Sequence, residues 1–305
     1  VNENTRKKVL EIVKKYNFNP NTLASGLKSN RTYLIAVVVA DITNSFFMDI
    51  GKGIENAIGN QKYSLVFADT HGDEKKELEV VKKLINRKID GIVLASVSEK
   101  EDVLKECRKK NVPVVQVDRQ IDDEDTNAVL WEDFRLAYTL AEHVIDKGHT
   151  NVAIENTRLG CSTGQHRLQG YLEAFRSQGI RIDEENISAS NFEMQDAYEH
   201  VKSLLEKPKC PTCIICSNNI MVKGSLKAIQ EKGLSIPEDI SICCFGNIET
   251  NEYSLTDITN IQQDTRLMGR KAGELLLSQI NEENHCSVKI KLSGKMIERS
   301  SVRQI

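Results

Sequence analysis

Polar and aromatic side chains gather directly after the first long apolar run of the chain. Residues 34–40 are uncharged and rich in Val and Ile, which is typical of a strand buried on both faces of a parallel sheet. A polar turn, DITNS, follows at 41–45 and precedes Phe46 and Phe47. Ligands of open α/β sheets bind just outside the carboxyl ends of the strands. This stretch therefore predicts a small-molecule site, and the alternative is an ordinary strand, turn and helix with core phenylalanines.

Other chemistries find less support in the sequence. Cys210, Cys213 and Cys216 have the spacing of metal ligands, but TCIIC is typical of a buried strand, whose alternate side chains point to opposite faces. No fourth ligand stands nearby to complete a zinc site, and in a chain of this size without a secretory signal the eight cysteines are expected as thiols. No Gly-rich phosphate loop, nucleophile elbow or pair of catalytic carboxylates is recognisable. We expect no metal, no cofactor and no catalytic residue, hence not an enzyme.

The elements that position the polar turn alternate between strand and helix. Strands are expected at 34–40, 64–68, 91–95, 114–117 and 128–131, and in a second series at 152–155, 187–189, 212–216 and 240–245, with helices between them. Such alternation predicts an α/β fold of two Rossmann-like lobes with parallel sheets. Short strands at 258–261 and 288–292 flank a helix at 264–280. We expect these last elements to cross back and complete the two sheets, leaving a cleft between the lobes.

Charge is distributed unevenly along the chain. Residues 1–32 carry seven Lys or Arg and two Glu, a net charge of +5, whereas the whole chain is at −3 and the remainder therefore at −8. Because the amino-terminal segment is basic and the rest of the chain is acidic, we expect this segment alone to contact nucleic acid. The alternative is an exposed basic helix without a partner. No apolar run approaches the ~20 residues of a membrane span. We therefore expect a cytoplasmic protein with no membrane partner.

The chain as a whole resembles the lac/purine repressor family of bacterial transcription regulators. The motifs that carry this resemblance run in order from NENTRKKVLEIVKKYNFNPNTLASGLK through VVVADITNSFF, DGIVLAS, VPVVQVDRQ, KGHTNVAI, HRLQGYLEAF, SNNIMVKGSLKAI and LSIPEDISICCFGN to KMIERSSV. DITNSFF with VDRQ also resembles the ketodeoxygluconate-repressor branch. The resemblance implies a periplasmic-binding-protein-like effector domain. Expected boundaries are 33–131 plus 262–285 for the first lobe and 132–261 plus 286–305 for the second.

The same resemblance implies binding of operator DNA as a homodimer. Residues 1–32 resemble the end of a helix-turn-helix domain, with a third helix at 1–18 and a hinge helix at 20–29, and the recognition helix is expected upstream of Val1. Two hinge helices would enter the minor groove, where an apolar wedge unstacks a base step. Leu27 matches this wedge and Lys28 can reach phosphates. The expected DNA-binding residues are Asn21, Ala24, Leu27 and Lys28.

For the effector, the resemblance marks ten positions, most of which directly follow a strand or begin a helix. They are Asn44, Phe46, Phe47, Asp118, Arg119, Thr163, Arg167, Asn219, Asn247 and Gln263. Arg167, near a helix expected to start at Gly164, offers five donors in a rigid fork, and the alternative is a surface arginine.

Two departures from the family pattern bear on the ligand. Asn219 and Gly246 stand where relatives that bind neutral sugars usually carry acids, while Arg119, His166 and Arg167 remain. Fewer negative charges favour an anionic ligand, so the expected effector is a sugar acid or phosphorylated sugar rather than a neutral sugar. Trp131-Glu132 also replaces a more usual Asp-Asn pair. The alternative function is a sugar-binding protein of a transport system, against which the basic segment and the missing signal sequence argue.

Overall fold

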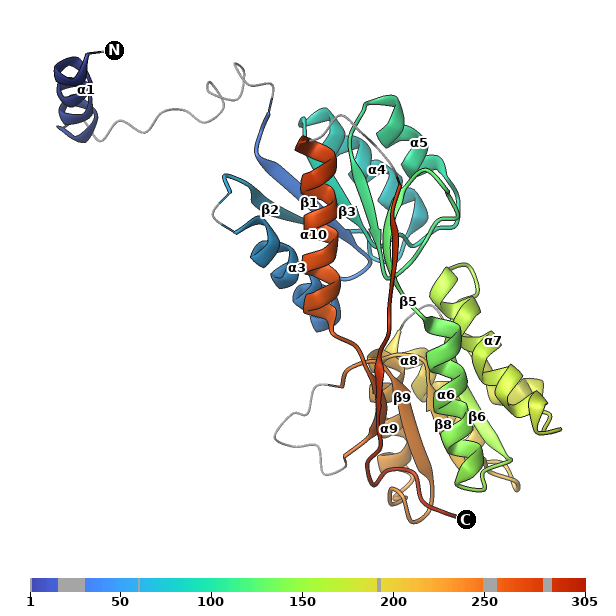
Figure 1. Cartoon of the computed structure of the whole chain (residues 1–305). Coiled ribbons are helices and arrows are strands. Elements are labelled where there is room, and N and C mark those ends of the chain that lie inside the picture. Colours follow the sequence, from blue (N-terminus) through green and yellow to red (C-terminus); the bar gives the residue numbers. More distant parts are fainter. Residues whose placement is uncertain (1, 16–30, 60, 191–192, 249–256, 282–286) are drawn as a thin grey trace.

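The computed structural model describes the chain except for residues 1, 16–30, 60, 191–192, 249–256 and 282–286. Two six-stranded sheets form two lobes, one above the other in Figure 1. The first sheet has the order β11-β5-β4-β3-β1-β2 and the second β12-β10-β9-β8-β6-β7. All pairs are parallel except β10 with β12. The predicted α/β fold of two lobes with parallel sheets is confirmed.

The first lobe contains five strands in chain order and the late strand β11. They are β1 (Leu34–Val39), β2 (Ser64–Asp69), β3 (Gly91–Leu94), β4 (Val114–Val117), β5 (Asn127–Trp131) and β11 (Lys289–Leu292). Its helices are α3 (Ser45–Ile58), α4 (Glu74–Asn86), α5 (Asp102–Lys109) and α10 (Thr265–Asn281). On β1, Ile35 and Val37 pack with α3 and α10, whereas Ala36 and Val38 pack with α4 and α5. Because neighbouring side chains point to opposite faces, one uncharged strand serves two helical layers.

The second lobe repeats this design. Its strands are β6 (Val152–Thr157), β7 (Ile187–Ser190), β8 (Cys213–Cys216), β9 (Ser241–Phe245), β10 (Thr259–Gln262) and β12 (Lys295–Ile297). Its helices are α6 (Asp133–Asp146), α7 (Ser162–Ser177), α8 (Met194–Leu205), α9 (Asn219–Glu231) and the short η1 (Glu184–Asn186). Cys213 and Cys216 lie buried on β8, as the expected strand requires, and within the described ranges no group of three possible metal ligands occurs.

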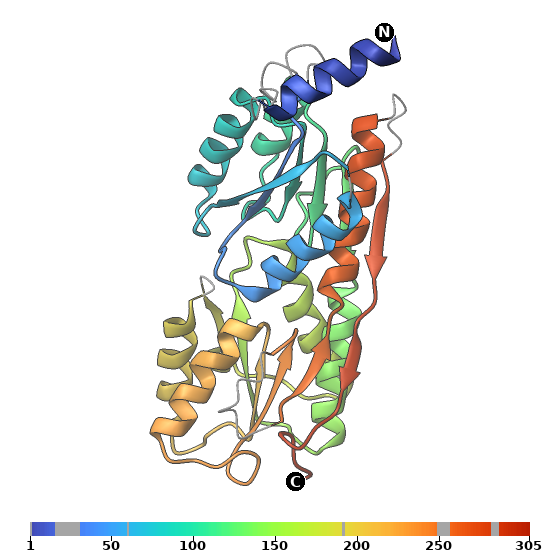
Figure 2. The same ribbon diagram turned by 90° about the vertical axis from the view of Figure 1, so that its left-hand side faces the viewer.

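Three connections join the lobes, from β5 to α6, from β10 to α10 and from β11 to β12. Figure 2 shows the segment of β11 and β12 running along one side of both lobes, past α10 on the first lobe. The expectation that residues 286–305 all belong to the second lobe is wrong for β11, which pairs in parallel with β5. In the KIKL sequence of β11, the lysines are exposed and the apolar residues are half-buried, as suits an edge strand.

At the amino terminus, α1 (Glu3–Lys15) lies within the range 1–18 where a helix was expected, and its basic side chains Arg6, Lys7 and Lys8 are exposed. The hinge helix expected at 20–29 lies outside the described residues, as do Asn21, Ala24, Leu27 and Lys28. None of the helices that the structure describes is long and apolar enough to cross a membrane.

A partly buried pair, formed by Glu155 and His200, lies within the second lobe. Glu155 on β6 is fully buried, and its carboxylate lies 2.6 Å from Nδ1 of His200. Nε2 of His200 faces the carbonyl of Glu185 at 3.1 Å, so both ring nitrogens meet acceptors. Burial alone lowers the pKa of His200, but the hydrogen bond and charge of Glu155 outweigh it and raise this pKa above its ordinary value.

Removing the His200 ring should therefore change stability in a pH-dependent way. We expect His200→Gln to lower the free energy of unfolding by about 1 kcal/mol at pH 6, the usual scale of one hydrogen bond. A pKa that is raised on folding contributes stability below its unfolded value, and this contribution is lost as the pH rises through the folded value. The difference between variant and wild type should thus shrink by pH 8 in urea unfolding. An equal deficit at both pH values would contradict the assignment.

Candidate functional site

A cleft lies between the lobes at the carboxyl ends of strands from both sheets. Sixteen residues line it: Ala40, Asp41, Asn44, Phe46, Phe47, Asp118, Arg119, Thr163, Arg167, Asn218, Asn219, Ile220, Phe245, Gly246, Asn247 and Gln263. All ten positions that the sequence singled out for the effector are among them, and their role as ligand contacts stays a prediction. Asn218, Ile220 and Phe245 were not expected there, although each adjoins an expected residue.

Aromatic rings form the wall of the cleft that the first lobe contributes. Asn44 caps α3 because its side chain accepts a hydrogen bond from the backbone N–H of Phe46 at 3.1 Å. The cap places Phe46 and Phe47 in edge-to-face contact, with ring centroids 5.3 Å apart. Phe47 is buried in the core, whereas Phe46 is half-buried. Apolar ring faces next to amide groups suit a ligand with both C–H and hydroxyl surfaces.

Amide side chains dominate the polar lining. Nδ2 of Asn219 donates to Oδ1 of Asn44 at 3.0 Å, which joins the second lobe to the first directly across the cleft. Asn247 and the backbone of Gln263 form a reciprocal pair, with Nδ2 donating to the carbonyl at 2.7 Å and Oδ1 accepting from the N–H at 2.8 Å. Nε2 of Gln263 is buried and has no hydrogen-bond partner in the described part of the chain. A ligand oxygen would satisfy this donor.

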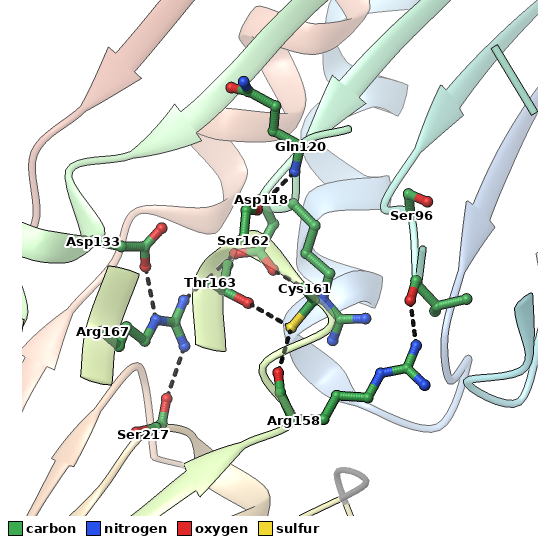
Figure 3. Close-up of polar contacts among 12 residues, drawn as sticks. Ser96, Asp118, Gln120, Asp133, Arg158, Cys161, Ser162, Thr163, Arg167 and Ser217 are labelled. Carbon is green, nitrogen blue, oxygen red and sulfur yellow. Dashed lines mark hydrogen bonds and ion pairs between the residues drawn. The ribbon is translucent and has the colours of Figure 1, made fainter. Parts of the chain in front are cut away.

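Arg167 is buried and held by both lobes (Figure 3). Its Nε donates to Asp133 Oδ1 at 2.7 Å and its Nη1 to the carbonyl of Ser217 at 2.7 Å. Its guanidinium also lies 3.7 Å from Asp118 and 4.0 Å from the centre of the Phe245 ring. Arg167 is therefore not a surface arginine, which was the alternative, and its guanidinium is fixed by contacts within the protein. The helix that carries it starts at Ser162, with Cys161 as N-cap, rather than at Gly164.

Asp133 is the functional neighbour that the sequence analysis missed. It is the first residue of α6, directly after the β5–α6 connection between the lobes, which we call the hinge, and it is 5% exposed. Burial raises the pKa of Asp133 to about 6, although the charge of Arg167 opposes this rise. For Arg167, burial acts downward on the pKa, but Asp133 and Asp118 more than compensate and the net shift is upward. The signal that the sequence offered was an acid two residues after Trp131, a residue that is itself atypical of the family.

Carboxylates also accompany the second arginine of the cleft. Arg119 is buried, and its Nε lies 3.8 Å from Asp118 Oδ2, whose residue adopts a left-handed backbone with φ of 62°. Nearby on α4, Glu77 accepts hydrogen bonds from Ser96 and from the N–H of Val97, both at 2.7 Å. Burial raises the pKa of Glu77, and the positive charge of Arg119 partly offsets this.

These contacts change the charge balance on which the anionic effector was expected. Arg167 has Asp133 and Arg119 has Asp118 beside it, while His166 lines a different cavity. The lining also includes the carboxylate of Asp41. The cleft is therefore nearly balanced in charge rather than positive.

Further polar contacts cross between the lobes beside the cleft. Ser162 accepts from the backbone N–H of Gln120 at 2.9 Å, and Gln165 donates to Glu99 at 2.7 Å. Arg158, in the loop after β6, donates to the carbonyl of Val97 in the first lobe, and Figure 3 shows this contact beside the Cys161 turn. The relative position of the lobes is thus set by polar groups that can be exchanged for water or ligand.

Residues 32–299 match the family model described as periplasmic binding proteins and sugar-binding domain of the LacI family. Curated relatives include the HTH-type transcriptional repressor PurR of Aliivibrio fischeri, 31% identical over 99% of this chain and 90% of the relative. The PurR of Vibrio cholerae is 29% identical over 100% of this chain and 91% of its own length.

Solved structures agree with this fold. A LacI family regulator from Enterococcus faecium with bound ribose is similar at a TM-score of 0.80 and 25% identity, covering 89% of this chain and 99% of that one. The regulator CelR in complex with cellobiose gives a TM-score of 0.81 at 23% identity, over 99% of this chain and 91% of that one, and supports the fold alone.

Proposed function

Because this chain belongs to the LacI/GalR family of transcription regulators, we propose that it is a ligand-responsive repressor that binds operator DNA as a homodimer. The effector is a small sugar-type molecule held in the cleft between the lobes. The observation that carries the proposal is the composition of this cleft, in which residues from both lobes and from the carboxyl ends of both sheets line one cavity.

The geometry supplies a means of coupling. The amide contact between Asn219 and Asn44 spans the cleft, so a ligand that inserts there replaces a contact between lobes with contacts to itself. Such a ligand binds one lobe arrangement better than another and shifts the population toward it. A change in the angle between the first lobes of a dimer would alter the spacing of the two hinge helices. DNA must in turn weaken or strengthen effector binding by the same factor.

The chemical class of the effector follows from the lining. Three phenylalanines, four asparagines, Thr163 and Gln263 offer ring faces and neutral hydrogen-bonding groups. These groups match the C–H faces and hydroxyls of a sugar. A sugar acid or phosphorylated sugar remains our more specific proposal, supported by Arg119 and by the absence of acids at Asn219 and Gly246.

The rival function is a sugar-binding protein that serves a transport system, which would use the same two lobes. The relatives described above are transcription repressors and not enzymes or transport proteins. The exposed basic side chains of α1, those of Arg6, Lys7 and Lys8, also favour contact with DNA. A regulator is therefore the function that sequence and structure support best.

The test uses the protein expressed from its complete reading frame. An operator is selected from a random DNA pool, and sugars, sugar acids and sugar phosphates are screened by thermal unfolding. A ligand at 100 times its Kd should add about 2.7 kcal/mol of stability. The same ligand should change the DNA affinity by about fivefold or more.

Phe46→Ala should abolish the ligand response and keep DNA binding, whereas Leu159→Ala, at an exposed position, should keep both. A ligand that stabilises the protein without any selectable DNA sequence would favour the rival function.

A further inference from the structure

A second cavity opens at the hinge, on the other side of the Asp118–Arg167–Asp133 cluster from the effector cleft. Its volume is about 350 Å³, compared with about 70 Å³ for the cleft. The lining combines Trp131 and Phe134 of the β5–α6 connection with Ser162 and His166 of α7 and with Lys291 of β11. Elements of both lobes therefore contribute to it, as they do to the cleft.

One buried donor of this cavity has no acceptor. Trp131 is 3% exposed, and its Nε1 has no hydrogen-bond partner among the described residues. Leaving a buried N–H unpaired is unfavourable, and such groups usually meet a partner in the functional state. Trp131 also stands where the family pattern has an acid, so this chain has replaced a carboxylate with an indole at the cavity wall.

Each of the three carboxylates in the lining, those of Asp118, Glu132 and Asp133, lies beside an arginine. Asp133 is paired with Arg167 at 2.7 Å, Glu132 with Arg135 at 3.3 Å, and Asp118 with Arg119 at 3.8 Å. Within the described parts of the chain, neither Lys291 nor His166 forms an ion pair with a carboxylate. Burial lowers the pKa of His166, and the charges of Lys291 and Arg167 lower it further. The ammonium group of Lys291 lies at this end of the cavity and favours an anion there.

An apolar surface adjoins this positive end. Phe134 is 44% exposed although it lines the cavity, and its ring stacks on Tyr138 with centroids 6.3 Å apart. Trp131 and Leu130 extend the apolar wall. An aromatic or aliphatic body could cover Phe134 while an anionic group meets Lys291 and His166. An oxygen of the same molecule could accept from Trp131 Nε1.

We propose that this hinge cavity is a second ligand site, which binds a small organic anion with an apolar body. The carboxylate or phosphate group lies between Lys291 and His166, and the apolar body packs on Trp131 and Phe134. The class of ligand differs from that of the cleft, because the hinge cavity offers the ammonium group of Lys291 and an indole where the cleft offers amides.

The two sites share a wall, so they must influence each other. Asp118 lines both cavities, and Arg167 joins it to Asp133 on the hinge side. An anion beside His166 would change the field at Arg167, whose ring partner Phe245 lines the cleft. Binding at either site should change the affinity of the other by the same factor.

Trp131 makes the proposal directly testable, because it is the one tryptophan of the chain and lines the cavity. Its fluorescence is titrated with benzoate, with phenyl phosphate and with neutral benzyl alcohol. We expect a saturable change with at least one of the two anions and none with the alcohol, and the stronger anion shows which group the site prefers.

Lys291→Gln combined with His166→Gln should weaken this response tenfold or more. Lys289→Gln, an exposed lysine two residues earlier on the same strand, is the matched control and should leave it unchanged.

Two results would overturn the proposal. One is the absence of a saturable response to either anion up to about 10 mM, beyond the millimolar range of weak specific binding. The other is a response that survives the double variant but disappears in Phe46→Ala, which would place the anion in the effector cleft. Loss of the response in the double variant alone, with a wild-type response in Phe46→Ala, supports the hinge site.

Discussion

Replacing Arg167 with methionine should lower the free energy of unfolding by about 3–5 kcal/mol, the usual cost of removing one partner of a buried ion pair. The side chain is 6% exposed and its contacts come from three elements, with Asp133 at 2.7 Å, the Ser217 carbonyl at 2.7 Å and the Phe245 ring at 4.0 Å. Methionine fills most of the volume but leaves Asp133 buried without its counter-ion. Urea unfolding followed by circular dichroism measures the loss.

The effect of Arg167→Met should depend on pH in a defined direction. Burial already raises the pKa of Asp133 to about 6, and losing the opposing charge of Arg167 should raise it further. An acid whose pKa is raised on folding costs stability when it must ionise, so the cost is absent at low pH and grows as the pH rises. The deficit of the variant should therefore be larger at pH 8 than at pH 5. A deficit that does not change with pH would mean that Asp133 is not the orphaned group.

Two further variants separate the ion pair from general packing. Asp133→Asn combined with Arg167→Met should be more stable than the sum of the single variants predicts, because it leaves no buried charge alone. Arg176 lies on the same helix α7 and pairs with Glu173 at 2.6 Å, but 76% of its side chain is exposed. Arg176→Met should thus cost less than about 1 kcal/mol. Equal losses for both arginine variants would refute the special role of Arg167.

Sequence patterns were most informative where one local rule decides the structure. A short uncharged run rich in β-branched residues favours a strand covered on both faces. The strand β1 is of this kind, with Ile35, Ala36, Val37 and Val38 fully buried. The residues that follow each strand converge on the cleft because parallel strands end at the same edge. For the same reason the polar turn after β1, with Asn44 as the helix cap, could be assigned to a site without knowledge of the partners.

Long-range pairing was not accessible in this way. Nothing near Asp133 in the sequence shows that its carboxylate meets Arg167, 34 positions later. The strand at β11 was recognised, but its pairing with β5 rather than with the second sheet depends on the path of the chain across the hinge. The positive charge of the cleft was overestimated for a related reason, because Asp133, which neutralises Arg167, is close to it in space but distant from it in the sequence.

The structure also shows why one of the missing acids cannot simply be restored. Gly246 has a φ of 112°, a conformation that side chains with a Cβ rarely adopt, and an added Cβ would lie 3.3 Å from Gln263 Oε1. An aspartate there would be strained regardless of the ligand. Asn219 has no such restriction, because it is the first residue of α9 after the Asn218 cap. The charge of the cleft is therefore best tested at Asn219.

Asn219→Asp should reduce the affinity for a sugar acid by about 30- to 100-fold relative to the matched neutral sugar. The new carboxylate would lie at the point where Asn219 now reaches Asn44 at 3.0 Å across the cleft, directly in the ligand space. Two like charges about 5–8 Å apart repel by roughly 2–3 kcal/mol at an effective dielectric constant of 20. The neutral sugar lacks this repulsion, and its hydroxyls gain a charged acceptor. Asn219→Asp loses the amide contact between the lobes whichever ligand is bound, so the ratio of the two affinities isolates the effect of the charge. Gln230→Glu is the matched control, since it adds the same charge at an exposed position of α9 about 16 Å farther along the helix, at 1.5 Å per residue. Isothermal titration of each variant against the acid and the neutral form should show a wild-type ratio for Gln230→Glu. An unchanged ratio in Asn219→Asp would place the ligand away from this helix and would contradict the proposed position of the effector.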